Sequence, residues 1–143
     1  MTRNKHRIIV LDGDTCLRLI SSHPSRLGRV AFAEGGDADW PTVLPVNYAY
    51  IDGVVYFRTF EGSKLYAALR HQRVAFEVDH VDESWREGWS VLARGALAVV
   101  RDRGVIAAAD AQLESWAAGE DEQLVSLTID GATGRRVVGP PTG

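Results

Sequence analysis

Apolar and polar positions alternate along much of the chain, and this pattern predicts a protein built mainly from β-strands. In the run RVAFEVDHVD, residues 73–82, Val74, Phe76 and Val78 fall on one face of a strand, because side chains alternate between the two faces. Four other runs rich in β-branched and aromatic residues predict strands in the same way, at 28–34, 42–52, 54–60 and 89–100. A sixth strand is expected at 123–130, near the end of the chain.

Short turns separate several of these predicted strands. Asp52 and Gly53 lie where the run at 42–52 meets the run at 54–60, and this residue pair is typical of a two-residue type I′ hairpin. A second turn is expected at GATG, residues 131–134, before the closing run RRVV. Tight turns of this kind favour antiparallel neighbours over the alternating strands and helices of a parallel sheet.

Three short helices are expected beside the strands. The run at 12–22 offers Asp12, Asp14 or Thr15 as the N-cap, since these residue types accept hydrogen bonds from the first turn of a helix. The other two helices are expected at 63–70 and 104–118, the latter from apolar residues at helical spacing. About six strands with short flanking helices predict a small, mainly β (α+β) antiparallel barrel with helices at its ends.

Length and composition point to an ordinary globular protein, with one domain over residues 1–143. Of its residues 45% are hydrophobic and 24% charged, and 16 basic against 19 acidic residues give a formal net charge of −3. The charges are interspersed, which argues against a nucleic-acid partner because such proteins carry a basic stripe. No apolar run approaches the roughly 20 residues needed to span a membrane, and the N-terminal run at 8–11 is too short for a signal peptide.

Cysteine usage and the strand at 89–100 add two further expectations. The single cysteine, Cys16, excludes an intrachain disulfide and suits a cytoplasmic protein. It lies in an apolar run and is expected to be a buried packing residue. The strand at 89–100 is apolar on both faces apart from Arg94, so one face can line the barrel while the other needs a helix or a second subunit. A homodimer is therefore expected.

The stretch FRTFEGSKL, residues 57–65, concentrates groups that bind anions. A strand ends here and a helix begins, and a helix N-terminus presents unpaired backbone N–H groups to an anion. Arg58 adds a guanidinium fork and Lys64 a point charge. A phosphate site is one interpretation; the other is that both cations pair with Glu61 or with solvent and that Ser63 only caps the helix.

Other kinds of site find no support in the sequence. There is no nucleophile elbow, no dinucleotide-binding glycine motif, and no metal-ligand spacing among the four histidines. Glu77 and Asp79 share the polar face of a strand and are expected to be solvated. No metal site is predicted, and the catalytic residues stay unknown.

Several separated motifs, taken in order, resemble the pyridoxamine 5′-phosphate oxidase-like superfamily in its small actinobacterial form. They are LPVNYAYIDGVVYFRTFEGSKL, VAFEVDHVD, GWSVLARGALAVV and the ending TGRR. The resemblance runs from about residue 28 to 100 and continues to 136. It implies an FMN-binding split β-barrel, six-stranded and antiparallel, that forms a homodimer.

The resemblance also assigns roles to particular residues. Four of them would hold the cofactor phosphate: Arg58, Thr59, Ser63 and Lys64. Four consecutive residues would run beneath the isoalloxazine ring, mainly through their backbone: Leu44, Pro45, Val46 and Asn47. Trp89 and Ser90 would border the flavin near the dimer interface.

The function implied is that of a flavin-dependent oxidoreductase. The flavin would take hydride from a reduced donor, with a nicotinamide as a candidate, and pass it to a small organic acceptor. A deazaflavin-dependent reductase is the first alternative, because Arg58 and Lys64 would serve the phosphate of either cofactor. A carrier or sensor that binds flavin or haem without turnover is the second.

Overall fold

The computed structural model describes residues 5–33, 40–60, 73–113 and 122–140, and the structural statements below concern these residues. They contain seven strands and two helices. The strands are β1 (Arg7–Leu11), β2 (Leu27–Ala33), β3 (Pro41–Ile51), β4 (Val54–Phe60), β5 (Arg73–Asp82), β6 (Glu87–Val99) and β7 (Glu122–Val138). The helices are α1 (Gly13–Ser22) and α3 (Arg103–Gln112).

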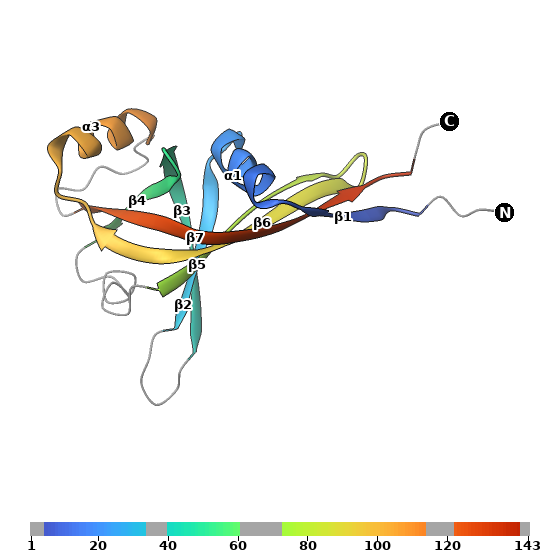
Figure 1. Cartoon of the computed structure of the whole chain (residues 1–143), viewed down its shortest axis with the longest axis horizontal. Coiled ribbons are helices and arrows are strands. Elements are labelled where there is room, and N and C mark those ends of the chain that lie inside the picture. Colours follow the sequence, from blue (N-terminus) through green and yellow to red (C-terminus); the bar gives the residue numbers. More distant parts are fainter. Residues whose placement is uncertain (1–4, 34–39, 61–72, 114–121, 141–143) are drawn as a thin grey trace.

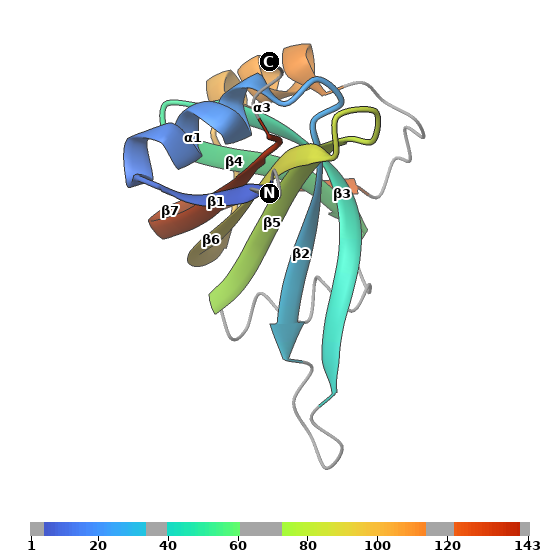
Figure 2. The ribbon, with the colours of Figure 1, turned by 90° about the vertical axis from the view of Figure 1, so that its right-hand side faces the viewer.

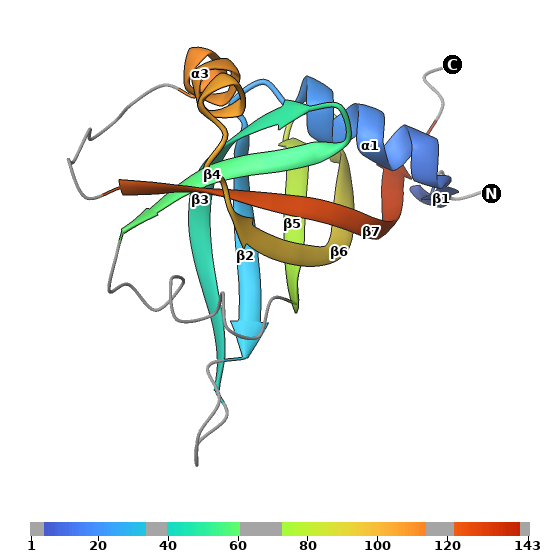
Figure 3. The same cartoon turned by 60° about the vertical axis from the view of Figure 1, so that its left-hand side comes forward.

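The strands form one antiparallel sheet that closes into a ring (Figure 1). Their order is β1-β7-β4-β3-β2-β5-β6, and β6 pairs back onto β7 to complete the ring. Both helices lie at the same end of this ring (Figures 2 and 3). The predicted mainly β barrel with flanking helices is therefore confirmed, with seven strands instead of six.

The turn predicted at 131–134 is wrong, because β7 continues through it as one strand of 17 residues. The pairing with β6 shifts at this point: Arg94 lies opposite Gly131, whereas the next residue, Gly95, lies opposite Ile129. The extra residue of β7, Asp130, is thus accommodated as a bulge, which bends a strand without ending it.

The strand that the sequence analysis did not predict is β1, which pairs with the last five residues of β7. The predicted hairpin turn is confirmed, since Asp52 and Gly53 have φ angles of 50° and 81°, as a type I′ turn requires. The helix expected at 12–22 is α1, with Asp12 as its N-cap. The helix expected at 104–118 is α3, described as far as Gln112, while the helix expected at 63–70 lies outside the described residues.

The core fills the interior of the ring. Tyr48 and Phe76 are two of its large buried rings and meet edge to face, with their centroids 5.1 Å apart. Helix α1 covers one end with Cys16 and Ile20, both fully buried, so the predicted packing role of the cysteine is confirmed. Burial also raises the pKa of the Cys16 thiol, which keeps it in the unreactive thiol form.

A second apolar cluster attaches α3 to the outer surface of the sheet. Ala109 of α3 is fully buried against Ala49 of β3, with Val100 and Leu124 completing the cluster. On β6 the inward residues are buried and the outward ones are exposed. Neither of the two described helices is long and apolar enough to cross a membrane.

Candidate functional site

The predicted ring-binding segment lies on β3, where its side chains alternate. Leu44 and Val46 pack against the core, whereas Pro45 and Asn47 are exposed. This part of β3 pairs with β2, and the pairs between β3 and β4 begin only at Tyr48. In the described part of the chain, the stretch around Pro45 is therefore hydrogen-bonded to a neighbouring strand along one edge only. Such a stretch tolerates proline, which has no backbone N–H to donate.

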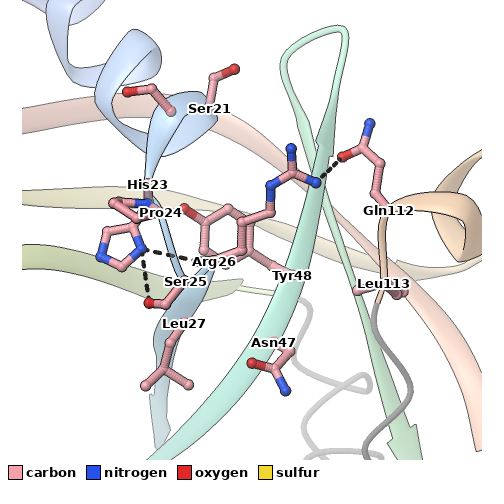
Figure 4. Close-up of a pocket in the computed structure, with 11 residues that line it drawn as sticks. Ser21, His23, Pro24, Ser25, Arg26, Leu27, Asn47, Tyr48, Gln112 and Leu113 are labelled. Atoms are coloured by element: carbon pink, nitrogen blue, oxygen red, sulfur yellow. Dashed lines mark hydrogen bonds between the residues drawn. The ribbon is translucent and has the colours of Figure 1, made fainter.

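A cavity of about 760 Å³ opens beside Asn47. Its wall comes from the turn between α1 and β2, from β3 and from the end of α3 (Figure 4). The lining residues are Ser21, Ser22, His23, Pro24, Ser25, Arg26, Leu27, Asn47, Tyr48, Gln112 and Leu113. Among the described residues, the lining thus combines hydroxyl, amide and guanidinium groups without a carboxylate.

Buried His23 shapes the turn that forms one side of this cavity. Its Nδ1 accepts a hydrogen bond from the backbone N–H of Arg26 at 3.1 Å and lies 3.2 Å from the hydroxyl of Ser25. The proton is therefore on Nε2, which donates to the backbone oxygen of Asp79 at 2.7 Å. His23 is 7% exposed, and it joins the turn to β5, a role that sequence analysis missed.

Arg26 and Gln112 connect this turn with α3. Arg26 has a left-handed backbone, with φ of 48°, a conformation that is uncommon outside glycine and tends to occur at functional sites. Its guanidinium donates to Gln112 Oε1 at 3.0 Å (Figure 4), and the backbone N–H of Tyr50 donates to the same oxygen at 3.2 Å. The amide of Gln112 thereby satisfies a donor of β3 and orients Arg26.

The predicted phosphate ligands are only partly within the described residues. Thr59 is buried on β4, while Ser63 and Lys64 lie outside the described part of the chain. Arg58 is described, and its guanidinium faces two carboxylates. One amino group donates to Asp110 of α3, and the other lies 3.7 Å from Glu122 of β7.

Trp89 and Ser90 lie on opposite faces of β6. The half-buried Trp89 ring packs edge-on against His23, with 5.7 Å between centroids. Ser90 is exposed on the outer face, opposite Asp79 of β5. Because β2 and β5 separate β6 from β3 in the ring, one chain does not bring Ser90 next to Leu44–Asn47.

A charged group occupies the outer face between these two predicted regions. Arg29 of β2 bridges Glu77 and Asp79 of β5 at 3.4 and 3.3 Å. Burial, together with the neighbouring Asp79 carboxyl, raises the pKa of the Glu77 carboxyl to about 7, against the opposing effect of Arg29. The prediction that Glu77 and Asp79 are solvated therefore holds only in part, because their side chains are 31% and 41% exposed and both are paired with Arg29.

Comparison with known proteins agrees with this architecture. The family model for pyridoxamine 5′-phosphate oxidase matches residues 12–136. The uncharacterized protein Rv0080 of Mycobacterium tuberculosis is 31% identical over 141 residues, covering 95% of this chain and 90% of that protein.

Two solved structures share the fold. An FAD-binding protein of Mycobacterium smegmatis is 30% identical with a TM-score of 0.73, covering 91% of this chain and 98% of the other. An FAD-binding protein of Mesorhizobium loti is 22% identical with a TM-score of 0.75, covering 90% and 97%. By its sequence match over most of its length and by its ring of strands, the chain belongs to the pyridoxamine 5′-phosphate oxidase-like family.

Proposed function

We propose that the protein binds a flavin, specifically FMN, and acts as an oxidoreductase on a small organic acceptor. The observation that carries this proposal is the cavity of about 760 Å³ beside Asn47, whose size is typical of sites for small ligands and cofactors. Membership of the family supports it, as does the FAD-binding neighbour at 30% identity.

The described residues fit a flavin ring in their chemistry. Asn47 is exposed beside the cavity and can both donate and accept hydrogen bonds, which matches the mixed donors and acceptors of an isoalloxazine. Leu44–Asn47 would support the ring through their backbone, and Thr59, Ser63 and Lys64 would hold the phosphate. Bound there, the flavin would supply hydride transfer, while the protein binds and orients the reactants.

A second copy of the chain would complete the site. Ser90 lies too far around the ring to border a flavin held by Leu44–Asn47 of the same chain, so its predicted role requires a partner subunit. The outer face of β6, with Leu92 partly exposed, is the surface through which we propose that the homodimer forms.

The polar lining of the cavity favours acceptors that carry an acidic group. Arg26 is the charged residue in the described part of this lining, where no carboxylate accompanies it. A guanidinium held in place by Gln112 is suited to a carboxylate or a similar planar anion. Benzoate is therefore expected to bind more tightly than the isosteric neutral benzamide, and Arg26→Gln should remove the difference.

Cofactor extraction from the purified native protein tests the proposal directly. Mass and absorbance distinguish FMN, FAD and a deazaflavin, and FMN is the expected result. A deazaflavin would move the protein to the alternative reductase function. A bound flavin that exchanges electrons with neither a reduced nicotinamide nor small acceptors would instead establish a carrier or sensor.

Substitution at Asn47 tests the site. Asn47→Leu should weaken flavin binding by about tenfold, because a hydrogen-bonding group typically contributes about 0.5–1.5 kcal/mol and more when its partner is left unpaired. Thr128→Val, on the exposed face of β7, serves as the control. Unchanged affinity in Asn47→Leu would contradict the placement of the ring.

A further inference from the structure

The surroundings of Arg58 differ from those expected of a phosphate ligand. Arg58 lies on the outer face of β4, where its two terminal amino groups face Asp110 of α3 and Glu122 of β7. Glu122 is a diagonal cross-strand neighbour, since Arg58 lies opposite Leu124. Both sides of the guanidinium fork are thus already directed at carboxylates.

The charges of this cluster disfavour a second anion. One guanidinium faces two carboxylates, so the three described side chains together carry a formal charge of −1. The Glu122 side chain is only 8% exposed, and water therefore screens its charge poorly. A phosphate dianion brought to Arg58 would be repelled by Asp110 and Glu122 at close range.

The cluster instead joins three elements of the fold. Asp110 directly follows Ala109, which is fully buried between α3 and the sheet. Two residues further along α3, Gln112 receives hydrogen bonds from Arg26 and from the backbone of Tyr50. The ion pair with Arg58 therefore acts on the part of α3 that forms one wall of the cavity.

We propose that Arg58 is a positioning residue that fixes α3 against β4 and β7, and thereby sets the wall formed by Gln112 and Leu113, without contacting a phosphate. The role of this wall in binding rests on the proposed function; the anchoring of α3 does not. The phosphate of the cofactor is then left to Thr59, Ser63 and Lys64.

Comparison of FMN with riboflavin separates the two roles of Arg58, because the ligands differ only by the phosphate. Affinities for both are measured by flavin fluorescence in the full-length wild type, Arg58→Ala and Asp110→Asn. A positioning role predicts that the ratio of the two affinities changes by less than about twofold in both variants. A ratio that falls about tenfold or more in Arg58→Ala, or FMN binding that tightens in Asp110→Asn, would show a phosphate ligand and overturn the proposal.

Hydrogen exchange of α3 measures the anchoring itself. Exchange of the amides at 105–113 should become about tenfold faster in Arg58→Ala and in Asp110→Asn, since charge-assisted contacts are lost, while exchange in β5 should stay unchanged. Arg103→Ala, which removes an equal charge from the exposed start of α3, should leave exchange unchanged. Unaltered exchange in Arg58→Ala would overturn the proposal even if the protein bound no flavin.

A charge swap provides the rescue. In Arg58→Glu with Asp110→Arg, the guanidinium moves to α3 and again faces two carboxylates, at 58 and 122. This double variant should recover the slow exchange of α3, and its ratio of FMN to riboflavin affinity should stay, as in the single variants, within about twofold of the wild type. Loss of the ratio despite restored α3 protection would assign the phosphate to Arg58 after all.

Discussion

Tyr48 ties the end of α1 to the middle of β3. Its side chain is almost fully buried, and its hydroxyl donates to the backbone oxygen of Ile20 in the last turn of the helix. Burial raises the pKa of Tyr48 above its usual range, so the hydroxyl stays protonated and remains a donor. The same residue lines the cavity, and its bond thus links the core to the site.

Tyr48→Phe should lower the free energy of unfolding by roughly 1–3 kcal/mol, because the carbonyl of Ile20 loses its partner while remaining buried. Urea unfolding followed by circular dichroism measures this loss. Tyr56→Phe, which removes a hydroxyl from a half-buried position on β4, is the control and should have a smaller effect. Equal losses in the two variants would show that the bond to Ile20 does not stabilise the protein.

Glu77 makes stability depend on pH. Its pKa is about 7 in the folded protein against an ordinary value of 4.5. Between these two pH values, the folded state therefore still holds a proton that the unfolded state has released. The free energy of unfolding therefore falls as the pH rises from about 4.5 to about 7. Because the side chain is 31% exposed, solvent screening limits the contribution to roughly 1 kcal/mol.

Glu77→Gln should make this decrease shallower, since glutamine carries no charge at any pH. Unfolding in urea at pH 5 and pH 8 gives the two free energies, and Glu83→Gln, at an exposed position, gives the background. The same difference between pH 5 and pH 8 in wild type and Glu77→Gln would mean that another group is responsible.

At the bulge between β6 and β7, the backbones of the two strands approach each other closely beside Gly95. A Cβ on Gly95 would overlap the backbone oxygen of Thr128, whereas a Cβ on nearby Gly131 would meet nothing within 4 Å. Gly95→Ala should therefore lower stability by about 2 kcal/mol or more, because backbone atoms must move. Gly131→Ala should change it by less than about 0.5 kcal/mol. A thermal scan of both variants compares them, and an equally mild effect would show that the two strands can separate locally at little cost.

The elements differ in how far the sequence predicts them. The hairpin at Asp52 and Gly53 follows from local turn chemistry and is confirmed. The GATG segment has the composition of a turn, but its pairing with β6 keeps it extended, and that partner lies about 40 residues away in the sequence. The short strand β1 depends in the same way on β7.

The candidate site was predicted less completely because its contacts, like these strand pairings, join residues far apart in the sequence. The exposed position of Asn47 on its strand follows from the alternation of its neighbours in the sequence. His23, however, gains its role from the backbone of Asp79, 56 residues later, and Arg58 gains its partner Asp110 across 52 residues. Hydrogen bonds and ion pairs over such separations leave no periodic signal in the sequence.

At the scale of the whole molecule, the outer face of the sheet is expected to pair with a second copy. Leu92→Arg places a charge on this face, and burying an unpaired charge strongly opposes association. Sedimentation should show a dimer for the wild type at micromolar concentration and a monomer for Leu92→Arg, with weaker flavin binding. Asp14→Arg, at an exposed position on α1, is the control. A wild-type monomer that still holds flavin would contradict the proposed link between dimer and site.

The pairing of β1 with the end of β7 has a consequence for biosynthesis. Arg7 lies opposite Val138, so nearly the whole described chain separates these two partners, and β4 and β6 also need β7 along their edges. A nascent chain halted before residue 122 leaves three strands, β1, β4 and β6, without this partner, and unpaired strand edges are prone to aggregate. Closure of the sheet must therefore wait until the last strand has left the ribosome, and chaperones that shield strand edges should matter most during that interval.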